Sequence, residues 1–293
     1  MRISVIIINK GERGVDETLA GLQQQTITLP YEVIIVDASN GALDDIYSKY
    51  PSVHTTPFTS KTGKKITIPE QRNVGIRQAK GDIIVFVDAN CDPQPNWLER
   101  LVAPIITSGE LITAGATRST GSKTFHDVEL SDGKTKTYLP SAPTINLAIA
   151  RSVFKKVGYF DENLNYGSDM DFTRRAVIAG YKILFVPSAI ISHDWGTLKQ
   201  EFKRAYRYGE AKTRLLRKHL EPTASFMKRE AVLVVYAGFI VLLPLTFWLP
   251  AYPLLVILPM AKNIRGNGPK LVLVNLVTAF GALKELPAHY LRR

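Results

Sequence analysis

The sequence has 293 residues, 45% of them apolar, so it can build one large α/β domain with an appendage, or two modest domains, and it is not a disordered chain. A formal net charge of +11 favours an anionic partner: a nucleic acid, a nucleotide or an anionic membrane surface. A single cysteine and an N-terminus without a signal-peptide pattern favour a reducing compartment, so we expect the first domain to stay in the cytosol.

Short apolar runs without polar alternation predict three buried strands near the N-terminus. These strands are residues 3–8, 32–37 and 82–88. Helical spacing of apolar residues, with proline or glycine at some boundaries, predicts the helices around them. These helices are residues 15–26, 41–50 and 68–81. The alternation of strands and helices predicts an α/β fold with a mostly parallel central sheet flanked by helices on both faces.

Two of the predicted strands end in an acid, Asp37 and Asp88. Ligands of parallel α/β sheets bind in a crevice at the carboxyl ends of the strands. Both carboxylates are therefore expected at the ligand-binding edge of the sheet.

Further strands and a helix are expected to complete this region. The strands are residues 110–115, residues 144–150 and two short runs within 182–195. Residues 118–142 are polar and contain glycine and proline, so we expect a loop or hairpin over the crevice. Residues 166–181 are expected to form a helix with Ser168 as its N-cap and acids in its first turn.

Three short motifs carry candidate chemistry. In "DAN", Asp88 and Asn90 can both turn an oxygen toward one Mg2+ or Mn2+ ion, although these residues also favour a plain turn. In "GSDMD", Asp169 can serve as a general base, while the alternative for Asp169 and Asp171 is to complement the helix dipole. In "ISHDW", His193 is either a structural residue or a third metal ligand.

Two familiar phosphate-binding patterns do not fit. "SKTGKK" lacks the first glycine and the final hydroxyl residue of a Walker loop, and "NKGERG" lacks the dinucleotide-binding glycine pattern. A Rossmann dehydrogenase is thereby disfavoured.

The order of the motifs is more specific than any one of them. "SVIIINKGERGVDETLAGLQQQT" is followed by "EVIIVDASN", by "QRNVGIRQAKGDIIVFVDANCDPQPNWLERL" and by "GYFDENLNYGSDMDFTRRAVIAGYKILFVPSAIISHDW". Over about residues 2 to 210, this series resembles glycosyltransferase family 2, the inverting transferases of the GT-A fold.

The resemblance implies roles for five positions. Asp37 matches the family acid that contacts the base or ribose of the nucleotide, and Arg72 matches the arginine of the "ARNxG" motif. Asp88 and Asn90 take the place of the "DxD" metal motif, which also contacts the nucleotide. Asp169 matches the aspartate of the "ED" motif, the expected base. His193 matches a histidine that often completes the metal site.

Two departures from the family pattern concern the metal and the base. Asn90 replaces the second acid of "DxD", which removes a negative charge and lowers the expected metal affinity. Ser168 replaces the glutamate of "ED" but leaves Asp169 in place. Asp171 and Trp195 are assigned to an acceptor or secondary site.

The implied chemistry is an inverting transfer from a nucleotide-diphosphate sugar, of the UDP or GDP type, with Mn2+ or Mg2+ as cofactor. In this interpretation, Asp169 takes the proton of an acceptor hydroxyl, which attacks the anomeric carbon.

The C-terminal third has a different composition. Residues 197–219 are helical in pattern and basic, which favours anionic lipid headgroups over a merely solvated face. Residues 231–249 form 19 uncharged positions, close to the ~20 needed to cross a bilayer. The prolines that follow leave two options: one span followed by an interfacial piece, or a bent hairpin. Lys262, Arg265 and Lys270 favour a hairpin that returns to the cytoplasmic side, and a buried helical subdomain is the alternative.

We therefore predict three regions. They are a GT-A catalytic domain (1–196), a basic juxtamembrane helical segment (197–229) and C-terminal membrane-associated helices (230–293). A membrane location, with the catalytic domain on the cytoplasmic face, implies membrane lipids as partners and a lipid-linked glycan as acceptor. The alternatives are a polyprenyl-phosphate sugar synthase and a non-catalytic nucleotide-binding scaffold. We expect no nucleic-acid partner, because no aromatic-basic platform accompanies the charge.

Overall fold

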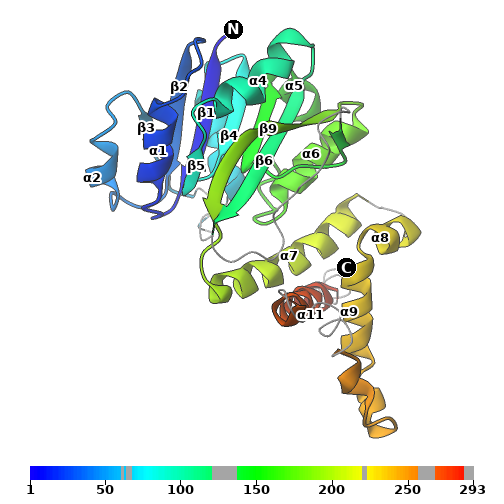
Figure 1. Ribbon diagram of the computed structural model, residues 1–293. Coiled ribbons are helices and arrows are strands. Elements are labelled where there is room, and N and C mark those ends of the chain that lie inside the picture. Colours follow the sequence, from blue (N-terminus) through cyan, green and yellow to red (C-terminus); the bar gives the residue numbers. More distant parts are fainter. Residues whose placement is uncertain (61–62, 64–67, 121–136, 220–222, 257–267, 287–293) are drawn as a thin grey trace. The chain divides into compact units, whose positions relative to one another are not determined.

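The computed structural model of the chain describes residues 1–60, 63, 68–120, 137–219, 223–256 and 268–286. The described residues divide into two compact units (Figure 1). The first unit contains residues 1–120 and 137–194, and the second contains residues 195–286.

The strands described in the first unit form a nine-stranded sheet with the order β3-β2-β1-β4-β8-β6-β9-β5, in which β7 also pairs with β9. The strands are β1 (Ile3–Asn9), β2 (Tyr31–Asp37), β3 (His54–Pro57), β4 (Ile83–Val87), β5 (Cys91–Pro93), β6 (Ile112–Thr120), β7 (Tyr138–Leu139), β8 (Asn146–Ala150) and β9 (Ile183–Asp194). The three predicted N-terminal strands are confirmed as β1, β2 and β4. The two short runs predicted within 182–195 form one strand, β9, and residues 121–136 of the predicted loop lie outside the described residues.

The sheet is mixed: its first half is parallel, while in its second half only β6 and β9 are parallel neighbours. β3, β2, β1 and β4 are mutually parallel neighbours, as predicted. β8 then runs antiparallel to both β4 and β6, and β5 and β7 run antiparallel to β9. The prediction of a mostly parallel sheet is therefore wrong for the second half. A short apolar run buried on both faces fits either strand direction, so the sequence pattern did not distinguish them.

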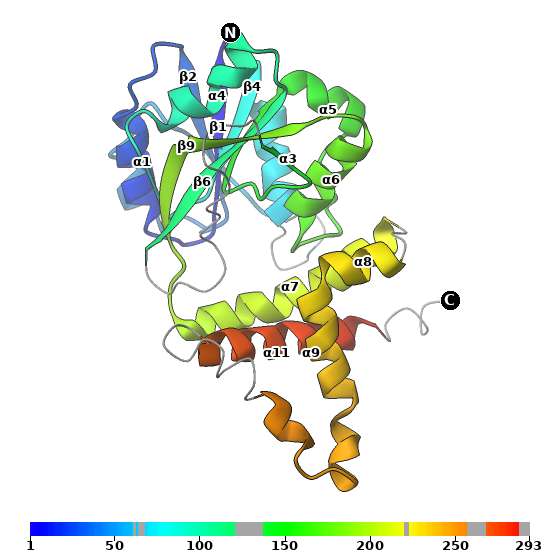
Figure 2. The ribbon, with the colours of Figure 1, turned by 45° about the vertical axis from the view of Figure 1, so that its right-hand side comes forward.

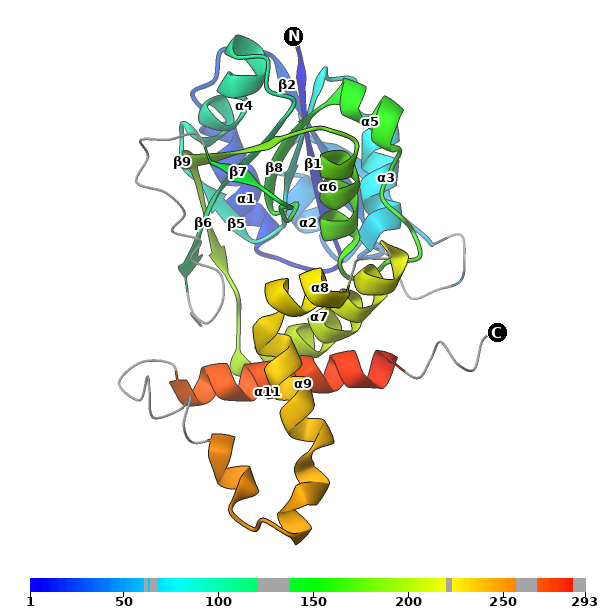
Figure 3. The same cartoon turned by 90° about the vertical axis from the view of Figure 1, so that its right-hand side faces the viewer.

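Helices cover both faces of the sheet, as predicted. They are α1 (Val15–Gln23), α2 (Asp44–Tyr47), α3 (Ile68–Gln78), α4 (Trp97–Thr107), α5 (Arg151–Val157) and α6 (Ser168–Ile178). Helices α3, α5 and α6 lie on one face, and α1 and α4 lie on the other (Figures 2 and 3). Helix α3 lies very close to β1, because a Cβ atom at Gly75 would be 2.6 Å from the Ile6 side chain.

The start of α6 differs from the expectation by one residue. Gly167 is the N-cap and has a left-handed φ of 79°, which glycine adopts without strain. Ser168 is instead the first residue of the helix, and it is buried. The prediction of Ser168 as the N-cap is therefore wrong. Its hydroxyl group does not cap the helix and can form a hydrogen bond with another buried side chain.

The second unit is helical in its described part. It contains α7 (Leu198–Lys218), α8 (Thr223–Arg229), α9 (Ala231–Val241), two 3-10 helices, η1 (Leu243–Phe247) and η2 (Tyr252–Val256), and α11 (Gly268–Glu285). Helix α7 confirms the predicted basic helix and begins with a capping box between Thr197 and Gln200. Helices α7 and α11 approach closely at Gly209 and Gly281, where added Cβ atoms would collide with the backbone of the opposite helix.

The apolar run 231–249 is not one continuous α-helix. Helix α9 ends at Val241, and Pro244 lies in the first turn of η1, where its missing N–H group costs no hydrogen bond. Within the described ranges, no helix combines the length and the apolar character that crossing a membrane requires. Lys262 and Arg265 lie outside the described residues.

Candidate active site

Four of the predicted site residues come together around Asp88, which follows the end of β4. Asp88 is half-buried, and its loss of contact with solvent raises the pKa of its carboxyl group. The positive charge of Arg72 lowers this pKa, the interaction with His193 lowers it as well, and the Asp169 carboxylate raises it. These four side chains come from α3, from the residue after β4, from α6 and from β9, so the fold gathers residues that lie far apart in the sequence.

Arg72 is held in place by its neighbours in the "QRN" motif. Gln71 donates hydrogen bonds to the carbonyl groups of Asn9 and Val36, which lie at the ends of β1 and β2. Asn73 exchanges hydrogen bonds with the backbone of Phe160. Both anchors are buried, so the first residues of α3 are fixed against the sheet.

The Arg72 side chain then points from α3 toward the start of α6. Its Nη1 atom donates to Ser168 Oγ at 3.3 Å, and its guanidinium group lies 5.6 Å from the centre of the Phe160 ring. Ser168 thus occupies the position that the "ED" pattern gives to glutamate, and it engages Arg72 by a hydrogen bond and not by an ion pair.

A tight turn carries the "DAN" motif. Asn90 has a left-handed φ of 81°, a conformation that asparagine tolerates better than most residues. The hydroxyl oxygen of Thr18, on α1, accepts hydrogen bonds from the N–H groups of Asn90 and Cys91 at 3.1 and 2.9 Å. The same hydroxyl donates to the Cys91 carbonyl at 2.8 Å. Thr18 is fully buried and therefore fixes the shape of this turn from inside.

The turn also orients His193. Cys91 and His193 are opposite each other in the β5–β9 ladder, and His193 Nδ1 lies 2.9 Å from the Asn90 carbonyl oxygen and 3.5 Å from the Cys91 sulfur. Since a carbonyl oxygen only accepts hydrogen bonds, Nδ1 carries the proton. The neutral imidazole then has its lone pair on Nε2, which is the form that ligates a metal.

The amide group of Asn90 points toward the start of α1. Its Nδ2 atom donates to the carbonyl group of Asp194, and its Oδ1 atom lies over Gly14, where a Cβ atom would leave no room for it. The role of Asn90 as a metal ligand stays a prediction.

Asp37 lies at the end of β2, and its buried carboxylate is surrounded by hydroxyl groups. It accepts hydrogen bonds from Tyr47 at 2.9 Å and from Ser39, and Asn9 donates to the Tyr47 oxygen. Burial and the Asp37 carboxylate raise the pKa of Tyr47, so Tyr47 stays a protonated donor. Each oxygen of this carboxylate therefore accepts a hydrogen bond from a neighbouring side chain.

The two acids of "GSDMD" have different surroundings. Asp169 accepts a hydrogen bond from the backbone of Met170 and is the acid that interacts with Asp88. Asp171 is completely buried and forms an ion pair with Arg175 at 3.0 Å, which ties α6 to the preceding loop through the Val157 and Tyr159 carbonyls. Its assignment to an acceptor site stays a prediction.

Trp195 belongs to the second unit. Its carbonyl group accepts a hydrogen bond from Arg204, and the Arg204 guanidinium group lies 5.5 Å from its ring centre. Its assignment to an acceptor or secondary site likewise stays a prediction.

Among the described side chains, no group of three or more His, Cys, Asp or Glu residues is placed to hold a metal ion. Asp88 and His193 form a smaller set, an anionic oxygen and an oriented imidazole, which are ligand types that fit Mn2+ or Mg2+. The half-buried Asp88 carboxylate, which also interacts with the Asp169 carboxylate, is a group that a bound cation would stabilise.

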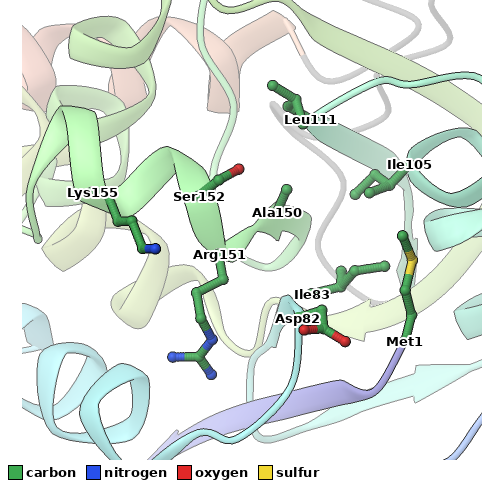
Figure 4. A pocket seen from close by; sticks show the side chains of 9 residues that line it. All are labelled: Met1, Asp82, Ile83, Ile105, Leu111, Ala150, Arg151, Ser152 and Lys155. Atoms are coloured by element: carbon green, nitrogen blue, oxygen red, sulfur yellow. The ribbon is translucent and has the colours of Figure 1, made fainter.

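A shallow hollow of about 370 Å³ lies away from these residues (Figure 4). It is lined in part by Asp82, Ile83 and Arg151, at the end of the sheet where β4 begins. Asp88 follows the opposite end of β4, so this hollow is separate from the candidate site.

Sequence reasoning missed the residues that position the candidate site. Thr18, Gln71 and Asn73 touch backbone groups of distant elements, so only the fold reveals their contacts. The "QRN" motif directed attention to Arg72, but the burial of Gln71 and Asn73 on either side of it is seen only in the structure.

Comparison with known proteins gives consistent matches. Residues 4–165 match the model of "Glycosyl transferase family 2", and residues 104–276 match that of "Glycosyl transferase family group 2". The glycosyltransferase AglE of Haloferax volcanii is 28% identical over 223 residues, which are 71% of this chain and 72% of that protein. The pre-mycofactocin glycosyltransferase of Mycobacterium tuberculosis is 30% identical over 170 residues, which are 52% of this chain but only 36% of that protein.

Two solved structures share the fold at low sequence identity. TarS of S. aureus superimposes with a TM-score of 0.54 at 18% identity, over 75% of this chain and 44% of that one. GalNAc-T7, solved with UDP, GalNAc and Mn2+, superimposes with a TM-score of 0.57 at 19% identity, over 79% of this chain and 56% of that one.

Proposed function

We propose that this chain, which belongs to glycosyl transferase family 2 and is a glycosyltransferase, moves one sugar from a nucleotide-diphosphate sugar to a hydroxyl group of a lipid-linked glycan. The observation that carries the proposal is the meeting of Arg72, Asp88, Asp169 and His193 at one end of the sheet. A half-buried carboxylate, a buried cation and an oriented imidazole match the needs of a diphosphate and a cation better than those of an apolar ligand.

The donor site is proposed to use both sides of this cluster. Arg72 is held rigidly by α3 and supplies a fixed positive charge for phosphate oxygens. Asp37, at the end of the neighbouring strand β2, is proposed to contact the nucleoside. The structure of GalNAc-T7 with UDP supports a nucleotide donor of the UDP type, and GDP is the alternative.

Asp88 and His193, with Asn90 as the third candidate, are the residues proposed to hold a divalent ion, Mn2+ or Mg2+. When bound, such an ion would supply charge stabilisation for the departing diphosphate. The protein's own contribution is to keep Nδ1 of His193 protonated by the Asn90 carbonyl and to hold the turn through Thr18.

Asp169 is the proposed general base. Its position in the first turn of α6 keeps its carboxylate at the helix N-terminus, where negative charge is stabilised. A carboxylate in this position can take the proton of the acceptor hydroxyl group as that oxygen attacks the anomeric carbon, and inversion follows from a single displacement.

The proposed location is a membrane, with the first unit on its cytoplasmic face. The support is the basic helix α7 together with the uncharged run 231–256 of the second unit. A lipid-linked acceptor follows from this location.

The test is the melting temperature of the full chain in detergent with UDP, GDP, ADP or CDP, each with and without Mn2+. We expect one uridine or guanosine nucleotide to raise the melting temperature only with Mn2+, because a ligand that binds the folded state stabilises it by mass action. Asp88→Asn should abolish the shift, and Asp92→Asn, an exposed acid two residues beyond Asn90, should preserve it. A chain whose melting temperature no nucleotide shifts would contradict the donor proposal.

The base has a separate test. If Asp169→Asn kept most of the transfer activity, the acceptor would be a group that needs no base, such as a lipid phosphate, and the hydroxyl acceptor would be excluded.

A further inference from the structure

The second unit exposes its most apolar segment. Residues 241–256, which we name the apolar tip, contain η1, η2 and the turn between them, and they carry no charged side chain. Phe247 and Trp248 are 87% and 82% exposed. The other large exposed apolar side chains of the tip are Val241, Leu242, Leu243, Leu245, Leu249, Leu254 and Leu255. A contiguous apolar surface of this kind marks an interaction site and not ordinary surface variation.

The apolar tip is part of an ordered hairpin. The Tyr252 hydroxyl group donates to the Phe239 carbonyl at 3.1 Å, and the two rings stack with centres 5.2 Å apart. Residue 252, after the turn, is therefore fixed against residue 239, before it. The tip lies at the far end of α9 from α8 (Figures 2 and 3).

Both ends of this hairpin are attached to the same helix, α7. Before α9, Glu230 forms an ion pair with Lys212 of α7. After the tip, Lys270 at the start of α11 forms an ion pair with Glu201 of α7 at 2.9 Å. The chain therefore leaves α7 and comes back to α7, so the hairpin enters and leaves any surface from one side.

The exposed charges of the described part of this unit have one sign. All four of its described glutamates are in ion pairs and none is exposed; they are Glu201, Glu210, Glu230 and Glu285. The exposed charged residues are Lys199, Lys203, Arg207, Lys218, Lys228, Arg229 and Lys284. Exposed positive charge and an apolar aromatic tip in one unit are complementary to an anionic lipid bilayer, in which headgroups and acyl chains meet the two kinds of side chain.

We propose that the apolar tip is a monotopic membrane anchor, which inserts into a bilayer containing anionic lipid and returns to the same side. This inference rests on the membrane location proposed above and specifies its structural basis. The five residues of η1 rise about 10 Å at ~2 Å per residue, which is less than the ~30 Å of a hydrocarbon core. Insertion thus ends within the acyl chains, with Phe247 and Trp248 as the deepest aromatic residues.

The experiment measures binding of the full chain to preformed vesicles of phosphatidylcholine with 30% phosphatidylglycerol. We expect the double variant Phe247→Ser with Trp248→Ser to reduce the partition coefficient more than about tenfold, because each buried aromatic side chain contributes that much. The matched control is Ile178→Ser, an apolar residue of the first unit that is 69% exposed, and it should leave binding unchanged. Equal binding of the double variant and the parent would overturn the proposal.

Depth and direction come from tryptophan fluorescence. Brominated lipids should quench the emission of the parent protein but not of Trp248→Phe, and iodide trapped inside the vesicles should quench neither. Quenching by the trapped iodide would show that the tip crosses the bilayer and would overturn a one-sided anchor. Identical quenching of the parent and Trp248→Phe by brominated lipids would also overturn it.

The charge component is tested by Lys228→Gln, which should lower the partition coefficient at low salt by up to about fivefold, while Lys155→Gln in the first unit should not. Binding that is independent of both phosphatidylglycerol and Lys228 would remove the anionic lipid from the proposal.

Failure of the anchor is distinguishable from failure of the donor site. The double variant should keep the nucleotide-dependent melting shift of the parent, so loss of lipid binding with an intact shift supports the anchor alone. A tip that instead pairs with a second copy would make the parent dimeric without lipid and the double variant monomeric, and that result would overturn the proposal.

Discussion

The two units of this chain differ in which groups they bury: the first buries charged side chains, and the second exposes apolar ones. The first unit buries charged groups at one end of its sheet, where Asp37 and Arg72 are enclosed by the fold and Asp88 is half-buried. The second unit pairs its described acids and exposes Phe247 and Trp248. Buried charges are costly unless a ligand or partner compensates them, and exposed apolar patches are costly unless something covers them. The first unit therefore calls for a charged ligand, and the second unit calls for an apolar partner.

The largest expected effect tests whether the acids of the first unit do chemistry or only stabilise the helix. Asp169→Asn should lower kcat by about 10²–10⁴-fold and leave the nucleotide-dependent melting shift in place, because an amide cannot accept the proton. Steady-state kinetics with a saturating donor measure this. Glu17→Gln removes an acid from the first turn of α1 and should leave kcat unchanged. A common effect of both substitutions would indicate that helix stability, and not proton transfer, explains Asp169.

The second prediction concerns the buried cation. Arg72→Lys should keep a positive charge but lose the planar contact with Phe160 and the hydrogen bond to Ser168. We expect the KM for the donor to rise about 10–100-fold, since the remaining point charge is less well positioned for a diphosphate. Arg77→Lys, on the exposed side of the same helix, is the control and should leave the KM unchanged. An unchanged KM in Arg72→Lys would mean that Arg72 serves the fold and not the donor.

The third prediction tests the turn that carries Asp88 and Asn90. Thr18→Val keeps the shape of the side chain but leaves the N–H groups of Asn90 and Cys91 without their acceptor. Unsatisfied buried donors cost about 1–3 kcal/mol each, so the loss of the acceptor for two of them should lower the free energy of unfolding by about 2–6 kcal/mol. The Mn2+ concentration that gives half of the nucleotide-dependent melting shift should also rise. Thr18→Ser, which retains the hydroxyl group, should restore both quantities, and a Mn2+ requirement equal to that of the parent in Thr18→Val would separate Thr18 from the metal site.

The sequence predicted the parts of the first unit that depend on local pattern. The buried strands β1, β2 and β4 and the placement of Asp37 and Asp88 at strand ends followed from apolar runs that stop at an acid. Strand direction did not follow, because β8 is buried on both faces and such a run fits either direction. Thr18 could not be assigned either, since its partners lie more than 70 residues away and its own neighbourhood looks like an ordinary helix.

The second unit was less predictable for a physical reason. A run of apolar residues in 231–249 is compatible with a spanning helix, a buried helix or a hairpin, and composition does not distinguish them. The distinguishing interactions are the stacking of Tyr252 on Phe239 and the ion pairs of Glu230 and Lys270 with α7. These are contacts between residues that are far apart in sequence, so no local pattern reports them.

The smallest expected effect concerns Cys91, a residue that the first unit buries beside its charged cluster. Burial raises the pKa of the Cys91 thiol well above its ordinary value, and the negative charge of Asp88 raises it further. The reactive thiolate is therefore scarce at neutral pH, and a maleimide should label the native chain far more slowly than the unfolded chain.

The raised pKa of Cys91 also makes the stability of the folded chain depend on pH. Since the folded state favours the protonated thiol, this contribution is complete below the unfolded pKa of about 8.5 and is lost as the pH rises above it. The melting temperature of the parent should thus fall more steeply between about pH 8.5 and pH 10 than that of Cys91→Ala. Equal slopes would show that Cys91 ionises as easily when folded as when unfolded, which would contradict the closed, charge-burying site that distinguishes the first unit from the second.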